Sequence, residues 1–319
     1  MSILQLLRLL ADGRFHSGEE LGTALGISRS AVWKRLQQLS AEHVLALHKV
    51  RGKGYRLEQP LSLLSVSELS ARLPSLTLWV EDCVDSTNAM ALKKLAEPAV
   101  ALPFAILAES QSAGRGRRGR HWVSPYGQSL YLSYAIRVER AAQLQALSLV
   151  VGLAVRRALQ SFGVSNVGLK WPNDLLVSGC KIAGILLELS GDPADVCHVV
   201  IGIGINANLL DANGIDQAWT SVQRVTGCPV DRNALAAVLL EQLDCVLTEH
   251  REHGFAAFHE EWEAGHLWQG FEVRLTSGVH EIDGRVLGVT LDGALRLLVD
   301  GVERTYSGGE LTLRLRHDS

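Results

Sequence analysis

The chain of 319 residues holds only five cysteines, which are widely spaced and form no C-x-x-C pair. Scattered cysteines in odd number fit neither a disulfide framework nor a zinc ribbon, because both need regular pairs. No apolar run approaches the ~18 residues of a membrane-spanning helix. The first residues also lack a basic segment ahead of an apolar one, so we expect no export signal. These absences predict a cytoplasmic protein without a membrane partner.

A zinc-site motif is also missing. Four histidines in the last third of the chain do not have the H-E-x-x-H spacing of a catalytic zinc site. Their surroundings are rich in glutamate and aromatic residues, which favours a solvated amphipathic helix. We therefore expect no metal ion that is held by the protein alone. The four histidines are His250, His253, His259 and His266.

Charge is distributed unevenly along the chain, although the net charge is only −3. Residues 1–60 contain nine Lys or Arg against five Asp or Glu, a net charge of +4, which leaves −7 for the rest. The length suggests about two domains, and a composition that is 47% hydrophobic can fill their cores. A basic head on an acidic body indicates a polyanionic partner for the head alone.

The basic head has the pattern of a helix-turn-helix. An apolar run over residues 4–10 predicts one helix. The capping-box spacing of Ser17 and Glu20 predicts the start of a second helix, which Gly26 ends. Ser28 then has the position of an N-cap for a third helix.

The third predicted helix turns an apolar face inward at Val32, Leu36 and Leu39. Its opposite face carries polar groups that suit base edges and phosphates, as on a recognition helix. Trp33 on that face either packs against a thymine methyl group or belongs to a second buried face. The residues predicted to face DNA are Ser28, Arg29, Ser30, Trp33, Lys34 and Gln37.

A basic hairpin follows, because residues 48–57 alternate in polarity and turn around Gly-Lys-Gly. A short serine-rich linker at residues 60–65 then leads to the body. The head either binds DNA or is a small helical bundle for protein contact. In the first case this wing lies along the phosphate backbone through Lys49, Arg51 and Lys53.

Residues 114–120 read Gly-Arg-Gly-Arg-Arg-Gly-Arg, which predicts an anion-binding loop. Arginine offers N–H donors in a planar fork, and glycine lets the backbone approach a ligand. The segment also fits the G-x-G-x-x-G pattern of dinucleotide sites, with Glu139 about 20 positions further on. That pattern needs a helix to open at the glycines, whereas residues 121–127 have turn chemistry. The remaining interpretation is a flexible, solvated basic loop.

Polar groups follow several apolar strands of the body. Residues 85–88, Asp-Ser-Thr-Asn, lie between a strand and a helix, where their hydroxyls either bind a small polar ligand or cap the helix. The strand at 104–108 leads to Gln111 and the arginine loop. The strand at 199–206 carries two glycines, which either admit a ligand or relieve crowding between layers.

Lys181 stands at the start of an apolar strand, after a tight turn at Ser178-Gly179. Its predicted hairpin partner carries Asn173 and Asp174 at its entrance. A lone lysine at a strand start is usually a surface charge. In this setting we expect instead a cation that steadies the charge developing in a transition state.

Five motifs, in order behind a winged helix-turn-helix, closely resemble the family of bifunctional biotin-protein ligases and biotin operon repressors over almost the entire chain. They are residues 85–88, 114–122, 170–174, 181–185 and 202–206. The resemblance implies an α+β multidomain fold. Its parts are a winged helix-turn-helix DNA-binding domain over 1–60, a class II aminoacyl-tRNA synthetase-like (biotin/lipoate ligase) catalytic domain over 65–268, and an SH3-like β barrel over 269–319. Short alternating pieces at 272–275, 284–288 and 295–299 agree with a barrel.

The resemblance also implies a two-step reaction with ATP and Mg²⁺. The carboxylate of biotin attacks the α-phosphate to give biotinyl-5'-AMP and pyrophosphate. A specific lysine of the biotin carboxyl carrier protein of acetyl-CoA carboxylase then attacks the adenylate. The adenylate is further implied to act as corepressor, by favouring a homodimer on the operator DNA of biotin synthesis genes.

The family's site residues map onto this chain by resemblance. Catalysis is implied for Lys181, Arg117, Asp174 and Arg115, with Asp174 as the base or the orienting group for the acceptor amine. The residues implied to bind biotin are Ser86, Thr87, Asn88, Gln111, Arg115, Gly116, Arg117, Lys181, Gly184 and Gly204. The residues implied to bind the nucleotide are Arg117, Arg120, Asn173, Asp174, Asn206, Trp219 and Arg314. Of these, Trp219 ends a loop over residues 211–219 that resembles the family's adenine-covering segment.

Three alternatives stay open. A ligase for another small acid such as lipoate shares the central fold, although the arginine loop is of the biotin type. A metabolite-sensing regulator with a dead active site is disfavoured, because Arg117, Asp174 and Lys181 are intact. The third is a biotin-protein ligase whose head no longer represses transcription.

Overall fold

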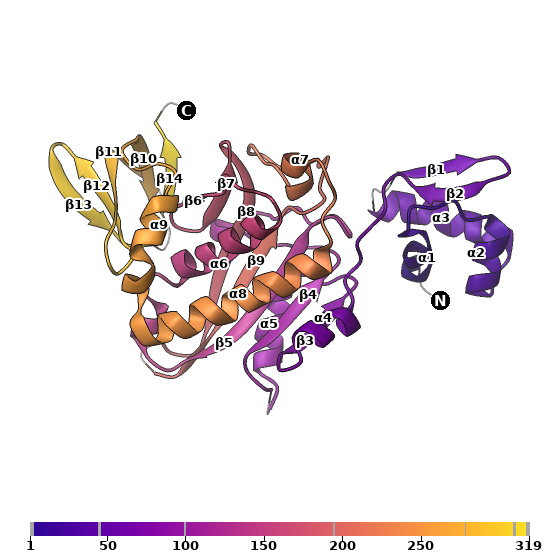
Figure 1. The fold of residues 1–319 in the computed structure, drawn as a ribbon, viewed down its shortest axis with the longest axis horizontal. Helices are drawn as coiled ribbons and strands as arrows, with labels where there is room; N and C mark the ends of the chain where they lie inside the picture. Colours follow the sequence, from indigo (N-terminus) through magenta and orange to yellow (C-terminus); the bar gives the residue numbers. More distant parts are fainter. Residues whose placement is uncertain are drawn as a thin grey trace.

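The computed structural model describes residues 3–43, 46–98, 100–193, 195–277, 279–308 and 311–316. A small head, a large central part and a C-terminal sheet follow one another along the longest axis (Figure 1). None of the described helices has the length and apolar character to cross a membrane. The predicted α+β multidomain class is confirmed.

The head is a helix-turn-helix with a wing, as predicted. Ser17 and Glu20 form the capping box, and Gly26 ends the second helix in the left-handed conformation. Leucines and Val32 of all three helices form one buried cluster. The elements are α1 (Ile3–Leu10), α2 (Gly18–Leu25), α3 (Arg29–His43), β1 (Leu47–Val50) and β2 (Gly54–Leu57).

Seven strands of the described chain form the central sheet, in the order β3-β4-β5-β9-β8-β7-β6. Alternate residues of the central strands point to opposite faces, so that Phe104 and Ile106 pack in one cluster and Ala105 and Leu107 in another. The strands are β3 (Thr77–Glu81), β4 (Phe104–Ala108), β5 (Leu130–Val138), β6 (Gly168–Lys170), β7 (Asp174–Val177), β8 (Cys180–Ser190) and β9 (Cys197–Ile205).

Helices cover both faces of this sheet. Helix α5 packs on β4, β5 and β9, while α6 packs on β6, β7 and β8 and lies beside α8 (Figure 1). Asn206 directly follows β9, and Lys181 lies near the start of the neighbouring β8, so both lie at the same end of the sheet. The helices are α4 (Val66–Arg72), α5 (Thr87–Leu95), η2 (Ala141–Leu144), α6 (Leu147–Ser161), α7 (Val222–Thr226), α8 (Arg232–His253), η3 (Phe255–Phe258) and α9 (His259–Gly265).

The expectation of a solvated helix around the four histidines is partly wrong. His250 and His266 are buried, whereas His253 is exposed. The Nε2 atom of His250 lies 3.0 Å from the carbonyl oxygen of Gln145. Burial lowers the pKa of His266 to about 4. Hydrophobic periodicity in the sequence did not reveal that α8 packs against α6.

The C-terminal part is a five-stranded antiparallel sheet in the described residues, in the order β13-β12-β11-β10-β14. The three strand segments predicted from the sequence lie in β10, β11 and β12. In Figure 1 the last strand stands beside the end of the central sheet that carries β6. The strands are β10 (Glu272–Ser277), β11 (His280–Val289), β12 (Leu295–Val299), β13 (Val302–Tyr306) and β14 (Thr312–Leu315).

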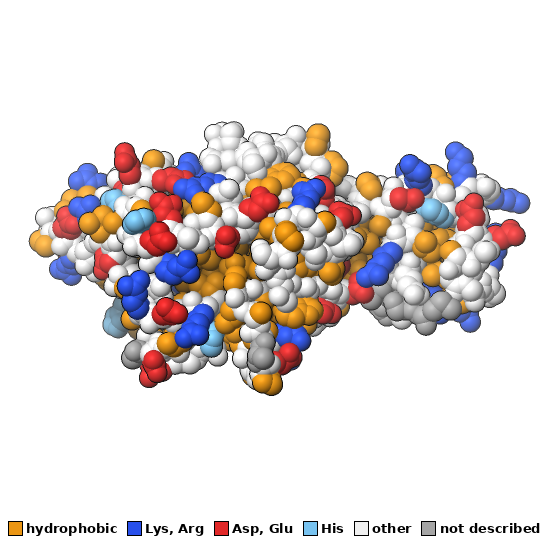
Figure 2. Space-filling view, turned by 60° about the horizontal axis from the view of Figure 1, so that its bottom comes forward, with side chains coloured by type: hydrophobic (Ala, Val, Ile, Leu, Met, Phe, Trp, Pro, Cys, Tyr) orange, Lys and Arg blue, Asp and Glu red, His pale blue; other side chains and the backbone are white. Residues whose placement is uncertain are grey.

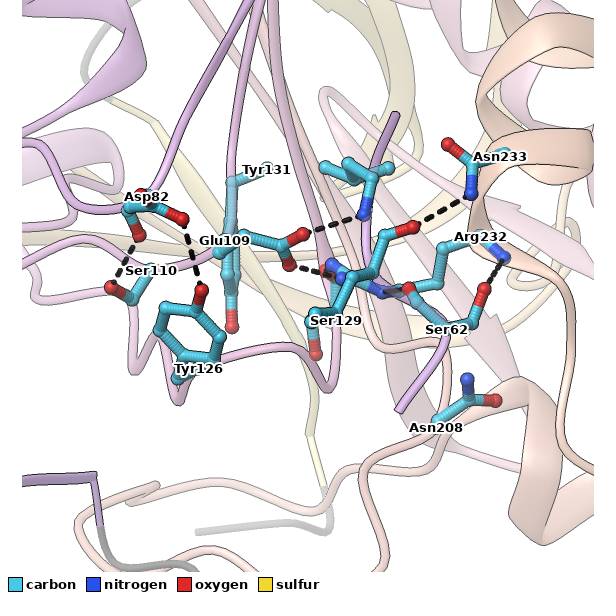
Figure 3. A network of polar contacts seen from close by, with 12 residues as sticks. Ser62, Asp82, Glu109, Ser110, Tyr126, Ser129, Tyr131, Asn208, Arg232 and Asn233 are labelled. Atoms are coloured by element: carbon cyan, nitrogen blue, oxygen red, sulfur yellow. Dashed lines mark hydrogen bonds and ion pairs between the residues drawn. The ribbon is translucent and has the colours of Figure 1, made fainter. Parts of the chain in front are cut away.

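The predicted linker is a bonded segment, which we call the strap (residues 61–65). Arg232, completely buried at the start of α8, forms an ion pair with buried Glu109. It also donates from Nε to the carbonyl of Ser62 at 2.8 Å and from Nη1 to the carbonyl of Ser129 at 2.8 Å. Glu109 accepts the backbone N–H of Leu64 at 2.5 Å (Figure 3). The strap is therefore held by a buried charge pair.

A second contact fixes the head to the body. Tyr126, from the body, is buried in the cluster that forms the core of the head. Its hydroxyl donates to Oδ1 of Asp82 at 3.1 Å (Figure 3). The same oxygen accepts from Nη2 of Arg8 on α1 at 3.2 Å. The head thus shares part of its core with the central part.

Candidate active site and nucleic-acid interface

The arginine loop is closed by its own backbone. Gly116 N–H donates to the carbonyl of Arg120 at 2.7 Å, and Trp122 N–H donates to that of Gly114 at 2.9 Å. A Cβ atom on Gly114 would come within 2.4 Å of the Trp122 carbonyl oxygen, so only glycine fits there. One short 3₁₀ turn, η1 (Arg117–Gly119), lies inside the loop, and no α-helix opens from it. The dinucleotide-fold alternative is therefore wrong.

Two arginines of this loop bond to two separate segments. Arg115 pairs with Glu188 on β8, at 3.0 Å between Nη2 and Oε2. Arg117 donates from Nη1 to Oδ1 of Asn173 at 2.7 Å. Burial lowers the pKa of Arg117, and the nearby carboxylate of Asp174 opposes this shift. The alternative of a free, solvated loop is wrong for these side chains.

All ten residues predicted for biotin line one cavity. Ser86 takes the N-cap position of α5, but its hydroxyl makes no capping bond. Gln111 supplies the missing acceptor, because its Oε1 accepts the backbone N–H of Thr87 at 2.9 Å. The helix-capping alternative is therefore wrong for Ser86.

Two side chains that the sequence analysis did not single out organise the wall of this cavity. The Ser133 hydroxyl lies 2.8 Å from Oγ1 of Thr87 and 2.5 Å from Oδ1 of Asn88. Asn88 also donates from Nδ2 to Oε2 of Glu188 at 2.7 Å. Ser133 and Glu188 lie inside β5 and β8, where the only signal was a polar residue in an apolar strand.

The glycines of β9 make room for side chains of the site. A Cβ atom on Gly202 would lie 2.4 Å from Oδ1 of Asn88. On Gly204 it would lie 2.5 Å from the Trp122 ring. The glycines therefore relieve crowding, and the side chains that approach them line the predicted biotin cavity. Approach of a ligand to these glycines stays a prediction.

Trp122 is a third residue that the sequence analysis did not assign. Its indole lines the predicted biotin cavity and two neighbouring cavities. Its buried Nε1 has no hydrogen-bond acceptor among the described residues. The Lys181 ammonium lies 5.4 Å from the centre of the ring. An unpaired, buried indole N–H beside three cavities is exceptional, because buried polar groups are normally hydrogen-bonded.

Lys181 and Asp174 form an ion pair across the β7–β8 hairpin, with 2.7 Å between Nζ and Oδ1. The backbone of Lys181 also bonds to the segment at residues 211–220. The Lys181 N–H donates to the carbonyl of Ala218 at 2.9 Å, and the Lys181 carbonyl accepts from the Thr220 N–H at 2.9 Å. Lys181 thus joins the hairpin to the predicted adenine-covering loop. Asn206 reinforces this junction by donating from Nδ2 to the carbonyl of Thr220 at 2.9 Å.

The residues predicted for the nucleotide fall around two cavities. Asn206 and Trp219 line the second cavity, which also contains Lys181 and Trp122. The Trp219 ring lies 4.0 Å from the guanidinium carbon of Arg224. Arg117, Arg120, Asn173 and Asp174 line the third cavity. Arg314 lies on β14 and is exposed, and it does not line any of the three cavities.

The predicted DNA-facing residues form an exposed surface of the head. Val32, Leu36 and Leu39 are buried, while Trp33 is 46% exposed, so the second-buried-face alternative is wrong. The wing residues are exposed as well, and Lys and Arg side chains project from the outer end of the head (Figure 2). The exposed set is Ser28, Arg29, Ser30, Trp33, Lys34, Gln37, Lys49, Arg51 and Lys53.

Two family models match the chain: the biotin/lipoate A/B protein ligase family over residues 80–206, and an HTH domain over residues 2–56. The bifunctional ligase/repressor BirA of Escherichia coli (strain K12) is 40% identical over 314 residues, covering 98% of this chain and 97% of that protein. The protein of the same name from Bacillus subtilis (strain 168) is 33% identical over 309 residues, covering 93% and 94%.

A solved structure, the biotin protein ligase from Aquifex aeolicus in complex with biotin and ATP, has a TM-score of 0.67 and 32% identity. The match covers 75% of this chain and 99% of that chain. Similarity to the E. coli relative extends through the head, the central sheet and the C-terminal sheet. The chain therefore belongs to the family of bifunctional ligase/repressor BirA proteins.

Proposed function

We propose that this protein uses ATP to attach biotin to a specific lysine of the biotin carboxyl carrier protein of acetyl-CoA carboxylase. We further propose that its adenylate-loaded form represses the genes of biotin synthesis. The observation that carries the ligase proposal is the meeting of three cavities at Lys181 and Trp122. An adenylate-forming site needs such a junction between the acid and the nucleotide.

The first step joins two anions, so positioning and charge neutralisation dominate the catalysis. A carboxylate oxygen of biotin attacks the α-phosphorus of ATP, and the bond to the β-phosphate breaks. Arg117 and Lys181 border both the biotin cavity and the third cavity, where they would neutralise the phosphate oxygens. Magnesium belongs to the substrate MgATP in this proposal. The described residues contain no cluster of His, Cys, Asp and Glu that could hold a metal ion.

The second step transfers biotin to the acceptor amine. The amine attacks the acyl carbon of the adenylate, and AMP leaves. Asp174 is our candidate for the group that orients the amine or takes its proton. Its carboxylate lies 2.7 Å from Lys181 Nζ, so both groups reach the same point of the site. The residues that we propose for nucleotide binding are the set predicted in the sequence analysis. Arg314 in that set would act from the C-terminal sheet.

Biotin-dependent exchange of labelled pyrophosphate into ATP tests the ligase proposal. We expect exchange only when biotin is present, followed by labelling of one lysine in a biotin carboxyl carrier domain. Lipoate and amino acids serve as control acids. Exchange supported equally by lipoate would contradict the biotin assignment, because the cavity would then not select its acid.

The repressor proposal rests on the exposed face of α3 and on the basic wing. We propose that α3 enters the major groove, that the wing follows the phosphate backbone, and that two adenylate-loaded copies bind one palindrome. An open sheet edge supports a homodimer. No described strand pairs with residues 187–190 of β8 on the side away from β9, and Leu189 there is 50% exposed. Such an edge can accept a strand of a second copy.

Arg29→Ala and Lys34→Ala should each weaken operator binding by about 1–3 kcal/mol, because each removes a base or phosphate contact. Biotin transfer should stay intact in both variants. Gel shifts on the protein's own biotin-synthesis promoter, with and without biotin and ATP, measure the effect. Arg72→Ala on α4 is the control. Binding that ignores the ligands, beside a working ligase, would make the head a structural element only.

The domain limits 1–60, 65–268 and 269–319 are also part of the proposal. The strap at 61–65, which lies between the wing and α4, supports the first limit. The cytoplasmic location stays a prediction.

A further inference from the structure

Glu188, near the end of β8, is a charged side chain to which the proposed mechanism gives no role. It stands behind the predicted biotin cavity, and the described lining of that cavity does not include it. One of its oxygens, Oε2, accepts from Nη2 of Arg115 at 3.0 Å and from Nδ2 of Asn88 at 2.7 Å. Both of these donors belong to residues that line the cavity. A single carboxylate oxygen therefore joins the arginine loop to α5 at the wall of the cavity.

The Glu188 carboxylate fixes the orientation of the Asn88 amide. A carboxylate only accepts hydrogen bonds, so it faces Nδ2 of Asn88 and not Oδ1. The second N–H of Nδ2 is directed to the carbonyl of Leu186, at 3.4 Å. Oδ1 then lies 2.5 Å from the Ser133 hydroxyl, and a Cβ atom on Gly202 would lie 2.4 Å from it. Because Asn88 is only 3% exposed, an inverted amide would lose these bonds without gaining bonds to water.

The same order of donors and acceptors continues to the surface of the cavity. Ser133 has one hydroxyl hydrogen, and its closer acceptor is Oδ1 of Asn88. The Ser133 oxygen is then an acceptor for the Thr87 hydroxyl at 2.8 Å, closer than Oε1 of Gln111 at 3.2 Å. Donation therefore runs in one direction, from Thr87 through Ser133 to Asn88, and ends at the carboxylate. The hydrogen of Thr87 is used within this chain, which leaves its oxygen as an acceptor at the cavity wall.

An acceptor at this wall matches the chemistry of biotin. The ureido ring of biotin carries two N–H groups, and each needs an acceptor when it is buried. If the chain ran in the opposite direction, Thr87 would present a hydrogen to the cavity instead. A wall that presents a hydrogen to an N–H group leaves both without a partner, which lowers affinity. The end of the chain at Glu188 thus determines what Thr87 offers to a ligand.

We infer that Glu188 is a positioning residue of the predicted biotin cavity, where it holds Arg115 and orients the Asn88 amide so that the wall offers an acceptor to a ureido N–H group. This inference rests on the proposed ligase function. Arg115, Asn88 and Thr87 line the predicted biotin cavity but neither of the two neighbouring cavities. Loss of the Glu188 carboxylate should therefore weaken the binding of biotin and leave that of ATP unchanged.

The test is pyrophosphate exchange with biotin and ATP varied in turn. Glu188→Gln keeps the size of the side chain but adds an N–H donor, so the Asn88 amide can invert and Arg115 loses its charge partner. The KM for biotin should rise about 10-fold, as expected for loss of a charge-assisted bond. The KM for ATP should stay within about 2-fold, because ground-state contacts to the nucleotide are retained.

Ser133→Ala breaks the chain at its middle and leaves the pair of Glu188 and Arg115 in place. It should also raise the KM for biotin, which gives a second variant if Glu188→Gln folds poorly. Both substitutions act through the same Asn88 amide. The double variant should therefore raise the KM for biotin by less than the product of the two single effects.

Glu303→Gln is the matched control, because Glu303 also accepts from an arginine, Nε of Arg296 at 2.7 Å, but lies in the C-terminal sheet. Its KM for biotin should not change. A wild-type protein without biotin-dependent exchange would contradict the ligase function itself. An active wild type with an unchanged biotin KM in both Glu188→Gln and Ser133→Ala would overturn the positioning role alone. An equal rise of the biotin and ATP KM values in Glu188→Gln, or single effects that multiply in the double variant, would also overturn it.

Discussion

Arg232→Met should lower the free energy of unfolding of the central part by about 3–5 kcal/mol, because it leaves Glu109 as a buried charge without its partner. Both side chains are almost fully buried, at 0% and 4% exposure. The substitution also removes the donors to Ser62 and Ser129. Urea denaturation followed by circular dichroism measures the loss.

Arg157→Met provides the matched control for this effect. Arg157 pairs with Glu261 at 2.5 Å, but the two side chains are 31% and 35% exposed. Pairs with that much exposure contribute about 1 kcal/mol or less. Replacing Glu109 by Gln together with Arg232→Met should recover part of the loss, because no unpaired charge then remains buried. A loss no larger than that of Arg157→Met would show that the pair does not hold the strap.

Arg117→Gly should release the adenylate about 10 to 100 times faster, because a charge-assisted bond to phosphate contributes about 1.5–3 kcal/mol. This expectation rests on the bond from Arg117 to Asn173 and on its position in the lining of both the predicted biotin cavity and the third cavity. Labelling of bystander lysines should increase as free adenylate accumulates. The lifetime of the enzyme-bound adenylate, measured by its dissociation after mixing with excess unlabelled biotin and ATP, checks the prediction.

Lys181→Ala should act on another step, by slowing formation of the adenylate, as loss of a transition-state contact does. Arg140→Ala, at the start of η2, is the control for loss of an arginine remote from the three cavities. If Arg117→Gly folds normally and retains its adenylate as long as the wild type, the retention role is wrong. The site would then hold its intermediate through other groups.

Features set by neighbouring residues were predictable from the sequence. The capping box of Ser17 and Glu20, the end of α2 at Gly26, and the turn at Ser178-Gly179 all formed as expected. Each depends on a bond or a dihedral angle within a few residues, so the local pattern determines it. The ten residues of the predicted biotin set, which come from separate motifs, line one cavity, although their role stays a prediction.

Contacts between distant segments were not predictable. Glu109 and Arg232 are 123 positions apart, and no local pattern of the sequence links them. Ser133 was hidden in an apolar strand, although it lies beside Thr87 and Asn88. Which charge is buried depends on how the helices pack on the sheet, and hydrophobic periodicity does not specify that packing. Assigning such pairs requires tertiary structure.

The strap fixes the position of the head on the body as well as connecting the two. Residues 61–65 are bonded to α8 and to the end of β4, and Tyr126 joins the core of the head, so the head cannot swing on a loose tether. In the proposed dimer the separation of the two recognition helices is then fixed by the protein. Half-sites should be tolerated only at one spacing, and adding about half a helical turn, roughly 5 base pairs, between them should turn one half-site to the opposite side of the duplex.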